Sequence, residues 1–364
     1  MKNRLHHATV GLSAAAVAVL ALSGCGSDNA ASAGGQPSAK ANCATGSIMA
    51  SGSSAQANAM SEWVKGYTAS CSGATINYQA VGSGAGIQAF IQGSTAFAGS
   101  DSALKDEEHG PADARCKSGK AIDLPMVAGP IAVAYNLPGV DSLTLTPSLI
   151  AKIFSGKVTT WDDPAIAAVN SGAKLPSKAI QSFHRSDSSG TSDNFTKYLT
   201  AAAGSDWTYD HAKEWKAPGG QGAKGSDGVT TSVKQTEGGV AYVEYSFAKN
   251  ASLGVAKVDN GAGAVELTPD AVGKAVEAAT VVGAGNDLAL KLDYTTKVPG
   301  AYPIALVTYE ITCEKGLSSD QLAVVKSFLA YTAGDGQQTL TDLGYAPIPA
   351  SLQAKVTAAI AALS

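Results

Sequence analysis

Short apolar segments alternate along this chain with longer segments of helical spacing, and turns rich in glycine and serine separate them. Residues 74–80 carry Ile76 and Tyr78 at alternate positions, as a strand does, whereas residues 55–69 repeat apolar side chains at helical intervals. Strands that alternate with helices indicate an α/β fold around a largely parallel sheet. Ligands of such sheets bind beyond the carboxyl ends of the strands, where loops lead into helices.

The same pattern predicts further elements along the chain. Strands are expected at 46–50, 97–99, 130–136, 179–184, 239–245 and 301–309, and helices at 87–91, 147–154, 192–200, 268–278, 319–331 and 349–363. Residues 216–239 are rich in Gly, Ser and Lys and are expected to form a loop. About 320 residues follow Asn42. A single hydrophobic core is usually smaller than this, so two lobes are expected.

The first residues have the features of an export signal. Lys2 and Arg4 precede an uncharged apolar run at 8–22, which is too short to span a bilayer comfortably. The run ends in Leu-Ser-Gly-Cys, which resembles the lipobox of bacterial lipoproteins, where the cysteine, here Cys25, becomes the lipidated first residue. An ordinary secretion signal that ends near a cysteine is the alternative.

We therefore expect residues 1–24 to be a removed signal peptide and Cys25 to carry a lipid anchor. Residues 25–41 have almost no large apolar side chain and are expected to form a flexible tether. The processed protein is expected outside the cytoplasm, held on the cell membrane through its anchor.

The charge of the chain argues against some partners. There are 26 basic and 30 acidic residues, and loss of the signal removes two of the basic ones. An acidic chain without a basic run is a poor candidate for binding nucleic acid or an anionic membrane surface.

Four cysteines remain beyond the signal, at positions 43, 71, 116 and 313. An even number in an exported chain favours disulfides, and no CxxC or His–Cys spacing suggests a metal. Three pairings are open. We favour Cys71–Cys116 with Cys43–Cys313, because Cys71 and Cys116 each end a predicted helix on the same side of the sheet.

Three loops end a strand, open a helix and consist of Gly and Ser: residues 51–54, 82–86 and 188–192. The first N–H groups of a helix have no partner within the helix, and the helix dipole adds positive charge there, so an anion is a natural occupant. Simple helix capping by Ser and Thr explains any one loop equally well. Three such loops together favour an anion site.

Two charged residues sharpen this hypothesis. Arg185 lies in the segment from His184 to Ser192, where its guanidinium can clamp two oxygens of an anion and Asp187 can hold it in place. An ordinary surface ion pair is the alternative. Asp101 can accept a hydrogen bond from the proton of a phosphate, whereas sulfate has no proton to offer. As a single residue, Asp101 is as well explained by a helix cap.

Other chemistries find little support. There is no P-loop and no GxGxxG after a strand, and Val81 breaks the spacing of a nucleophile elbow. His184 as a hydrolase base lacks an activated serine, and His109 and His211 have no metal-ligand spacing. No metal or cofactor is expected. The four tryptophans Trp63, Trp161, Trp207 and Trp215 are assigned to packing and surface.

The motifs together resemble the phosphate-binding lipoproteins of the bacterial high-affinity phosphate ABC transporter. The resemblance extends over the chain after Asn42 and is carried by GSS (52–54), GSGAG (82–86), GSD (99–101), YNLPGV (135–140), KIFSGKVTTWDDPAI (152–166), HRSDSSGTSDNF (184–195) and YPI (302–304). It implies a two-lobed, hinge-linked periplasmic-binding-protein fold, class II-like, that binds phosphate and passes it to membrane-embedded permease subunits.

The resemblance also implies the site residues. Residues 42–130 with 300–364 would form lobe I, and 131–299 would form lobe II, with the ligand between them. Phosphate would be held by Ser53, Ser54, Ser83, Asp101, Arg185, Ser189, Gly190 and Thr191, with Asp187 as anchor of Arg185. One departure is Ser54-Ala55, where the family often has Thr-Phe, so that only the backbone N–H of Ala55 can reach a ligand.

Two alternatives stay open. A receptor for another tetrahedral oxyanion, sulfate or molybdate, would use the same helix-opening loops, but Asp101 disfavours it. An enzyme of the phosphatase type would need an activated nucleophile or metals, which the sequence does not offer in a convincing spacing. The chain is therefore expected to be a binding protein and not an enzyme.

Overall fold

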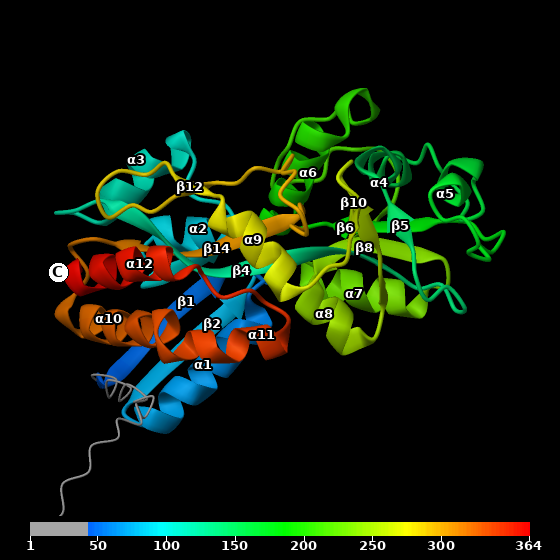
Figure 1. Cartoon of the computed structure of the whole chain (residues 1–364). Helices are drawn as coiled ribbons and strands as arrows, with labels where there is room; N and C mark the ends of the chain where they lie inside the picture. Colours follow the sequence, from blue (N-terminus) through cyan, green and yellow to red (C-terminus); the bar gives the residue numbers. More distant parts are fainter. Residues whose placement is uncertain (1–42) are drawn as a thin grey trace, which may run out of the picture. The chain divides into compact units, whose positions relative to one another are not determined.

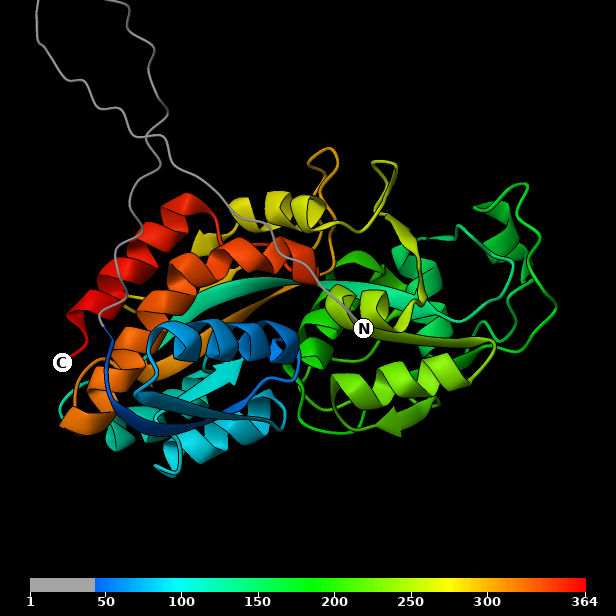
Figure 2. The same cartoon turned by 90° about the horizontal axis from the view of Figure 1, so that it is seen from below.

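The computed structural model describes residues 43–364, so the predicted signal peptide and the whole predicted tether, Cys25 included, lie outside the described residues. The described chain is built on a nine-stranded mixed sheet with helices on both faces (Figure 1, Figure 2). The strand order is β2-β1-β3-β14-β4-β8-β6-β7, and β9 pairs with β4. None of the described helices is long and apolar enough to cross a membrane.

The strands of the main sheet are β1 (Gly46–Gly52), β2 (Ala74–Ala80), β3 (Phe97–Ser100), β4 (Ala121–Tyr135), β6 (Gln181–Arg185), β7 (Gln221–Ala223), β8 (Gly239–Glu244), β9 (Gly254–Val255) and β14 (Ala305–Cys313). Small sheets are formed by β5 (Thr144–Leu145), β10 (Lys257–Asp259) and β11 (Ala264–Val265), and by β12 (Thr280–Val281) and β13 (Leu290–Lys291).

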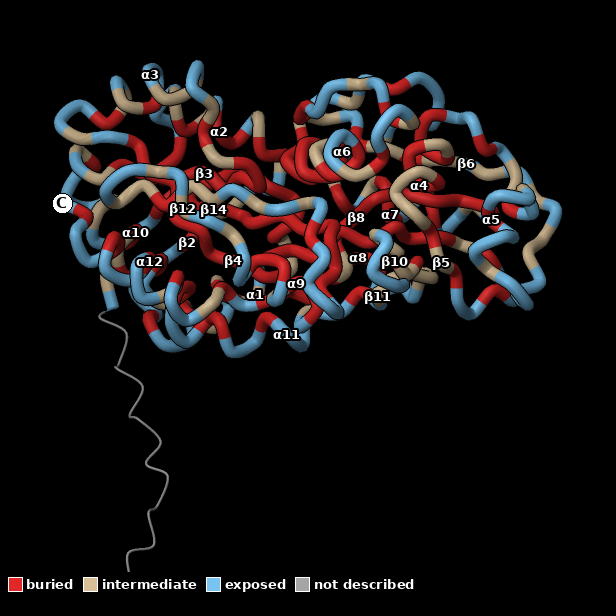
Figure 3. The backbone as a smooth tube through the Cα atoms, turned by 45° about the horizontal axis from the view of Figure 1, so that its top comes forward, coloured by how far each residue is buried: buried red, intermediate tan, exposed pale blue. Residues whose placement is uncertain are grey.

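The α-helices are α1 (Ala57–Ser70), α2 (Ser83–Ile91), α3 (Asp106–Arg115), α4 (Pro147–Phe154), α5 (Pro164–Ala168), α6 (Gly190–Ala202), α7 (Gly225–Gln235), α8 (Tyr245–Ala251), α9 (Pro269–Glu277), α10 (Ser319–Ala333), α11 (Leu340–Leu343) and α12 (Ala350–Ala362). The central strands β3, β14, β4 and β8 are buried throughout, and the outer loops are largely exposed (Figure 3).

Strand β4 joins the two halves of the sheet. All of its 15 residues are buried, and it changes partner along its length: residues 121–130 pair with β14, and residues 131–135 pair with β8. We call β1, β2, β3 and β14 the first half of the sheet, and β6, β7, β8 and β9 the second half. The change of partner falls between Pro130 and Ile131.

Two expectations about the fold were wrong. The sheet is mixed, because β14 and β4 run antiparallel to their neighbours; parallel pairing is confined to β1 with β2 and β3, and β6 with β7 and β8. Residues 216–239 also contain β7 and α7. The apolar face of α7 is built partly from small polar side chains, with Ser226 and Thr230 buried beside Val229 and Val233, so apolar spacing alone does not reveal it.

The predicted disulfide pairing was wrong as well. The bonds join Cys43 with Cys71 and Cys116 with Cys313, at Cα–Cα distances of 5.2 and 5.3 Å. Cys71 and Cys116 do each follow the end of a helix, α1 and α3. However, α1 returns the chain to the start of β1, beside Cys43. The register of β4 against β14 places Cys313 opposite Ala121, five residues after Cys116.

Candidate functional site

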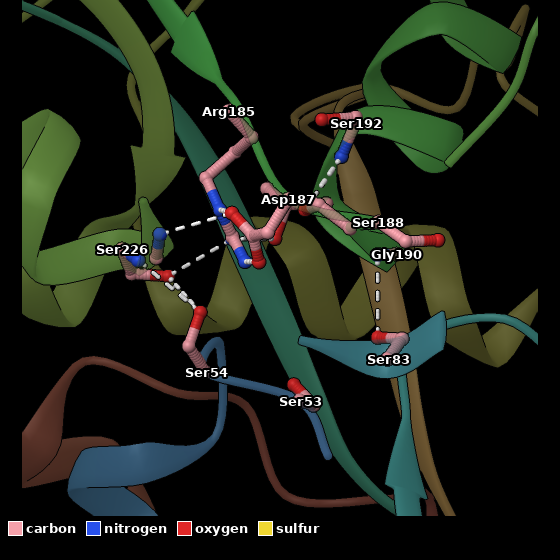
Figure 4. A network of polar contacts seen from close by, with 12 residues as sticks. Ser53, Ser54, Ser83, Arg185, Asp187, Ser188, Gly190, Ser192 and Ser226 are labelled. Atoms are coloured by element: carbon pink, nitrogen blue, oxygen red, sulfur yellow. Dashed lines mark hydrogen bonds and ion pairs between the residues drawn. The ribbon is translucent and has the colours of Figure 1, made fainter. Parts of the chain in front are cut away.

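The candidate site lies where the loops after β1, β3 and β6 meet the first turns of α2 and α6. The loop after β1 supplies Ser53 and Ser54, α2 begins at Ser83, and Asp101 directly follows β3. From the second half, β6 ends at Arg185 and α6 begins at Gly190. Figure 4 shows these elements converging, with Ser54 close to Ser226 and Ser83 close to Gly190. The eight residues predicted to hold phosphate therefore lie together.

Hydrogen bonds cross between the two halves at this place. The amide of Gly190 donates to Ser83 Oγ at 3.2 Å, and the amide of Ser226 donates to Ser54 Oγ at 3.1 Å. The side chain of Asn194 on α6 donates to the carbonyl of Asp101 at 2.6 Å. The two halves are thus in direct contact around the predicted ligand residues.

Asp101 is buried and surrounded by hydroxyl donors. Its Oδ1 accepts from Ser53 at 2.5 Å and from Thr308 at 2.8 Å, and its Oδ2 accepts from Ser83 at 2.9 Å. A carboxylate offers about four acceptor positions, so three donors leave one on Oδ2. Burial raises the pKa of Asp101 to about 6, even though the Ser53 hydrogen bond acts to lower it. The remaining position suits a protonated oxyanion.

Arg185 is the buried cation of the site, with only 2% of its side chain exposed. Its Nε donates to Asp187 Oδ1 at 2.7 Å, and its Nη2 pairs with Asp187 Oδ2. Burial alone would raise the pKa of Asp187, but the hydrogen bonds and charge of Arg185 bring it below its usual range. The anchoring role predicted for Asp187 matches this geometry, which leaves the Nη1 side of the guanidinium facing Thr191 and Ser226 at 3.4 Å each.

The first turn of α6 presents its amides at the site. Ser189 caps the helix, since its hydroxyl accepts from the amide of Ser192 at 3.2 Å. Gly190 allows a close approach of the two halves: a Cβ at this position would lie 2.6 Å from Asp101 Cβ and 2.7 Å from Ser83 Oγ. In the first loop, the amide of Ala55 donates to Ser53 Oγ at 3.0 Å.

Comparison with known proteins shows the family of the chain. Residues 37–335 match the family described as "PBP superfamily domain". The "Phosphate-binding protein PstS 3" of Mycobacterium leprae is 44% identical over 363 residues, which cover 96% of this chain and 98% of that protein. The chain belongs to the PstS family of phosphate-binding proteins. A second member, "Phosphate-binding protein PstS 3" of Mycobacterium tuberculosis, is 44% identical over the full length of both chains.

Solved structures share the fold of this PstS-family chain at lower identity. A high-affinity periplasmic phosphate-binding protein, solved with phosphate bound, covers 86% of this chain and 93% of its own, with a TM-score of 0.72 and 23% identity. A putative phosphate ABC transporter substrate-binding protein from Clostridium perfringens, also solved with phosphate, covers 84% and 100%, with a TM-score of 0.62 and 19% identity. At these identities the likeness supports the periplasmic-binding-protein fold.

Sequence reasoning missed three buried polar residues at the site. Ser226 opens α7, in the stretch expected to be a loop. Thr308 lies within β14, and Glu244 ends β8 and accepts from Thr191 Oγ1 at 2.5 Å. A signal was present for Glu244, because it is the one charged residue of the otherwise apolar strand β8, and buried polar groups need partners. Thr308 stands out less, because β14 also carries Glu310 and Thr312.

The histidines and tryptophans considered in the sequence make packing contacts and hydrogen bonds within the fold. The ring of His184 stacks on Trp215 at 5.2 Å, and the Nε1 atoms of Trp63 and Trp161 donate to backbone carbonyls. His211 pairs with Asp193 Oδ1 at 2.8 Å.

One group away from the site could hold a cation. Ligand atoms of His109, Asp123 and Asp287 lie within 4.8 Å of one another. Both carboxylates already accept hydrogen bonds from backbone amides, Asp123 from Leu104 and Asp287 from Asp123. These hydrogen bonds to the backbone explain why the three side chains lie together, and we assign the cluster a structural role.

Proposed function

We propose that this chain is an extracytoplasmic substrate-binding protein that captures inorganic phosphate and delivers it to the permease subunits of an ABC transporter. Its relatives are named phosphate-binding proteins, which supports the ligand. The observation that carries the proposal is a buried cation and a buried hydrogen-bond acceptor at one place: Arg185 on one half would attract the anion, and Asp101 on the other would accept a hydrogen bond from its hydroxyl group.

Residues 42–130 with 300–364 and residues 131–299 act, in this proposal, as two lobes that close on the ligand. The partner change within β4 and the hydrogen bonds between the halves support such a motion. Ser53, Ser54, Ser83, Ser189, Gly190 and Thr191 would supply hydroxyl and amide donors. For the serines bonded to Asp101, the hydroxyl protons must turn from the carboxylate to phosphate on binding.

The location outside the cytoplasm is part of the same proposal. Two disulfides support an oxidising compartment. Removal of residues 1–24 and lipidation of Cys25 would then hold the protein on the membrane surface close to its permease. Mass spectrometry of the mature N-terminus tests the anchor, and an unmodified first residue other than Cys25 would contradict it.

Calorimetric titration of the protein with phosphate, arsenate and sulfate tests the ligand. We expect one phosphate per chain and little heat with sulfate. In Asp101→Asn, the amide donates where the carboxylate accepted, so phosphate affinity should fall and sulfate affinity should rise. Heat with sulfate or molybdate but none with phosphate would favour a receptor for another oxyanion.

A further inference from the structure

One side chain joins the backbones of two proposed ligand residues that belong to opposite halves of the sheet. Asn194 follows the first turn of α6 and is 4% exposed. Its Nδ2 donates to the carbonyl of Asp101 at 2.6 Å and to the carbonyl of Gly190 at 2.8 Å. Both N–H groups of the carboxamide are thereby used, and one planar group spans the distance between Asp101 and Gly190.

The oxygen of this carboxamide is held from a third segment. Tyr294, between β13 and β14, donates its hydroxyl to Asn194 Oδ1 at 2.5 Å. Burial raises the pKa of Tyr294 well above its ordinary value, so the hydroxyl keeps its proton and is the donor. With a hydroxyl donor on one side and two carbonyl acceptors on the other, only one orientation of the Asn194 carboxamide satisfies all three partners.

Packing alone does not fix this orientation. Asp101, Asn194 and Tyr294 line a cavity of about 620 Å³, which leaves room beside the carboxamide. The segment that carries Tyr294 is held separately, because the amide of Leu290 donates to the hydroxyl of Tyr309 on β14 at 3.1 Å. The hydroxyl of Tyr294 is therefore the group that prevents the carboxamide from turning its oxygen toward the two carbonyls.

We propose that Asn194 and Tyr294 are positioning residues of the phosphate site: Asn194 sets the separation of Asp101 and Gly190, and Tyr294 fixes the orientation of the Asn194 carboxamide. This inference rests on the proposed function. The hydrogen bond from Asn194 to the Asp101 carbonyl forms only when the two halves are together, so it stabilises the closed arrangement and slows the release of phosphate.

The test is stopped-flow kinetics of phosphate binding and release by the full chain, by Tyr294→Phe, by Asn194→Leu and by the double variant. Tyr294→Phe removes one hydroxyl group, and we expect release about tenfold faster, with an unchanged association rate because association starts from separated halves. Asn194→Leu removes all three hydrogen bonds and should speed release about 10- to 100-fold. Since Tyr294 acts through Asn194, adding Tyr294→Phe to Asn194→Leu should change release no further.

Tyr309→Phe is the matched control, because it removes a buried hydroxyl that holds the same segment at Leu290 and does not bond to Asn194. It should release phosphate at the wild-type rate. A wild-type release rate in Tyr294→Phe overturns the inference, and this variant decides the matter where Asn194→Leu does not fold. The inference also fails if Tyr294→Phe keeps its full effect beside Asn194→Leu, or if Tyr309→Phe speeds release equally. A wild type that binds no phosphate overturns the proposed function itself.

Discussion

Arg185 shows how a cation can be buried and still serve a ligand. Asp187 takes the Nε and Nη2 side of its guanidinium, and the Nη1 side faces the first turns of α6 and α7. The carboxylate offsets the cost of burial and fixes the plane of the guanidinium. The orientation of the clamp is therefore set before any anion arrives.

Replacement Arg185→Lys keeps the charge and removes the planar fork. Because a lysine cannot make paired hydrogen bonds to Asp187 and a ligand together, we expect phosphate affinity to fall about 10- to 100-fold. Titration calorimetry measures the loss. The control is Arg115→Lys, since Arg115 donates to the backbone carbonyls of Phe90 and Thr95 away from the site. The phosphate affinity of this variant should equal that of the wild type. Unchanged affinity in the Arg185 variant would contradict the clamp.

Glu310 carries a pH dependence of stability. It is fully buried on β14, and its carboxyl group lies beside the side chain of Gln56. Burial raises its pKa well above 4.5. The folded state therefore binds the proton more tightly than the unfolded chain. Its contribution to stability is complete below about pH 4.5 and is lost as the pH rises through the raised value.

In Glu310→Gln this loss cannot occur, because the amide does not titrate. We expect the variant to be more stable than the wild type at neutral pH, by about 1–3 kcal/mol, and equally stable in acid. Thermal unfolding between acid and neutral pH measures the difference. Glu277→Gln, at an exposed position, should follow the wild-type curve. Parallel curves for the Glu310 variant and the wild type would contradict this account.

Much of the site could be named residue by residue because the loops that carry it combine glycine, serine and charge. Asp101 directly follows β3 and Arg185 ends β6, and a parallel arrangement brings the carboxyl ends of strands to one edge. Thr308 and Glu244 could not be assigned in this way. They belong to strands whose register and direction the sequence does not reveal, and only the pairing of β14 and β8 with β4 brings them to the site.

At the scale of elements, the start of α6 packs closely against the other half of the site. Gly190 lies against Asp101 and Ser83 of the other half, and a Cβ would stand 2.8 Å from Asp101 Oδ2. In Gly190→Ala, α6 must therefore withdraw from the loop after β3.

We expect Gly190→Ala to weaken phosphate binding at least tenfold while the fold is kept, because two of the proposed donors, the amides of Gly190 and Thr191, move with α6. Affinity and thermal unfolding together check this. Gly273→Ala in α9 is the control, since nothing lies within 4 Å of its Cβ position, and it should leave affinity unchanged. Equal affinities for both variants would show that the close approach is dispensable.

The elements themselves were predictable where apolar residues repeat with a clear period, as in α1 and β2. Helix α7 was missed because Ser and Thr share its buried face, and the first part of β4 because its residues are buried on both faces and show no alternation. The disulfide pairing was predicted wrongly because it depends on the position of the end of α1, which brings Cys71 next to Cys43 at the start of β1.

At the scale of the whole molecule, a buried ion pair connects the two halves. Lys213, from the segment between α6 and β7, has 3% of its side chain exposed, and its Nζ lies 3.1 Å from Glu108 Oε1 on α3. If the halves separate to admit phosphate, this pair must break. It therefore favours the closed arrangement without touching the ligand.

Removing one partner, as in Glu108→Gln, leaves the Lys213 charge buried and unpaired, which costs about 3–5 kcal/mol in the closed arrangement. Opening becomes easier, so we expect faster phosphate release and a weaker affinity, by about tenfold or more. Stopped-flow release kinetics measure this. Glu62→Gln, which breaks the exposed Lys65–Glu62 pair, is the control and should release phosphate at the wild-type rate. Identical release rates for both variants would show that the Lys213–Glu108 pair does not have to break when the halves separate.

The bond between Cys116 and Cys313 also gives the chain an uneven response to mechanical force. The two cysteines are 197 residues apart, and the whole second half of the sheet lies between them. A pull applied to the two termini passes through the disulfide and bypasses this loop, so the second half cannot be stretched while the bond is intact. Reduction would release on the order of 650 Å of additional extension. The second half of the sheet is thereby shielded from tension by a covalent bond at the edge of the first half.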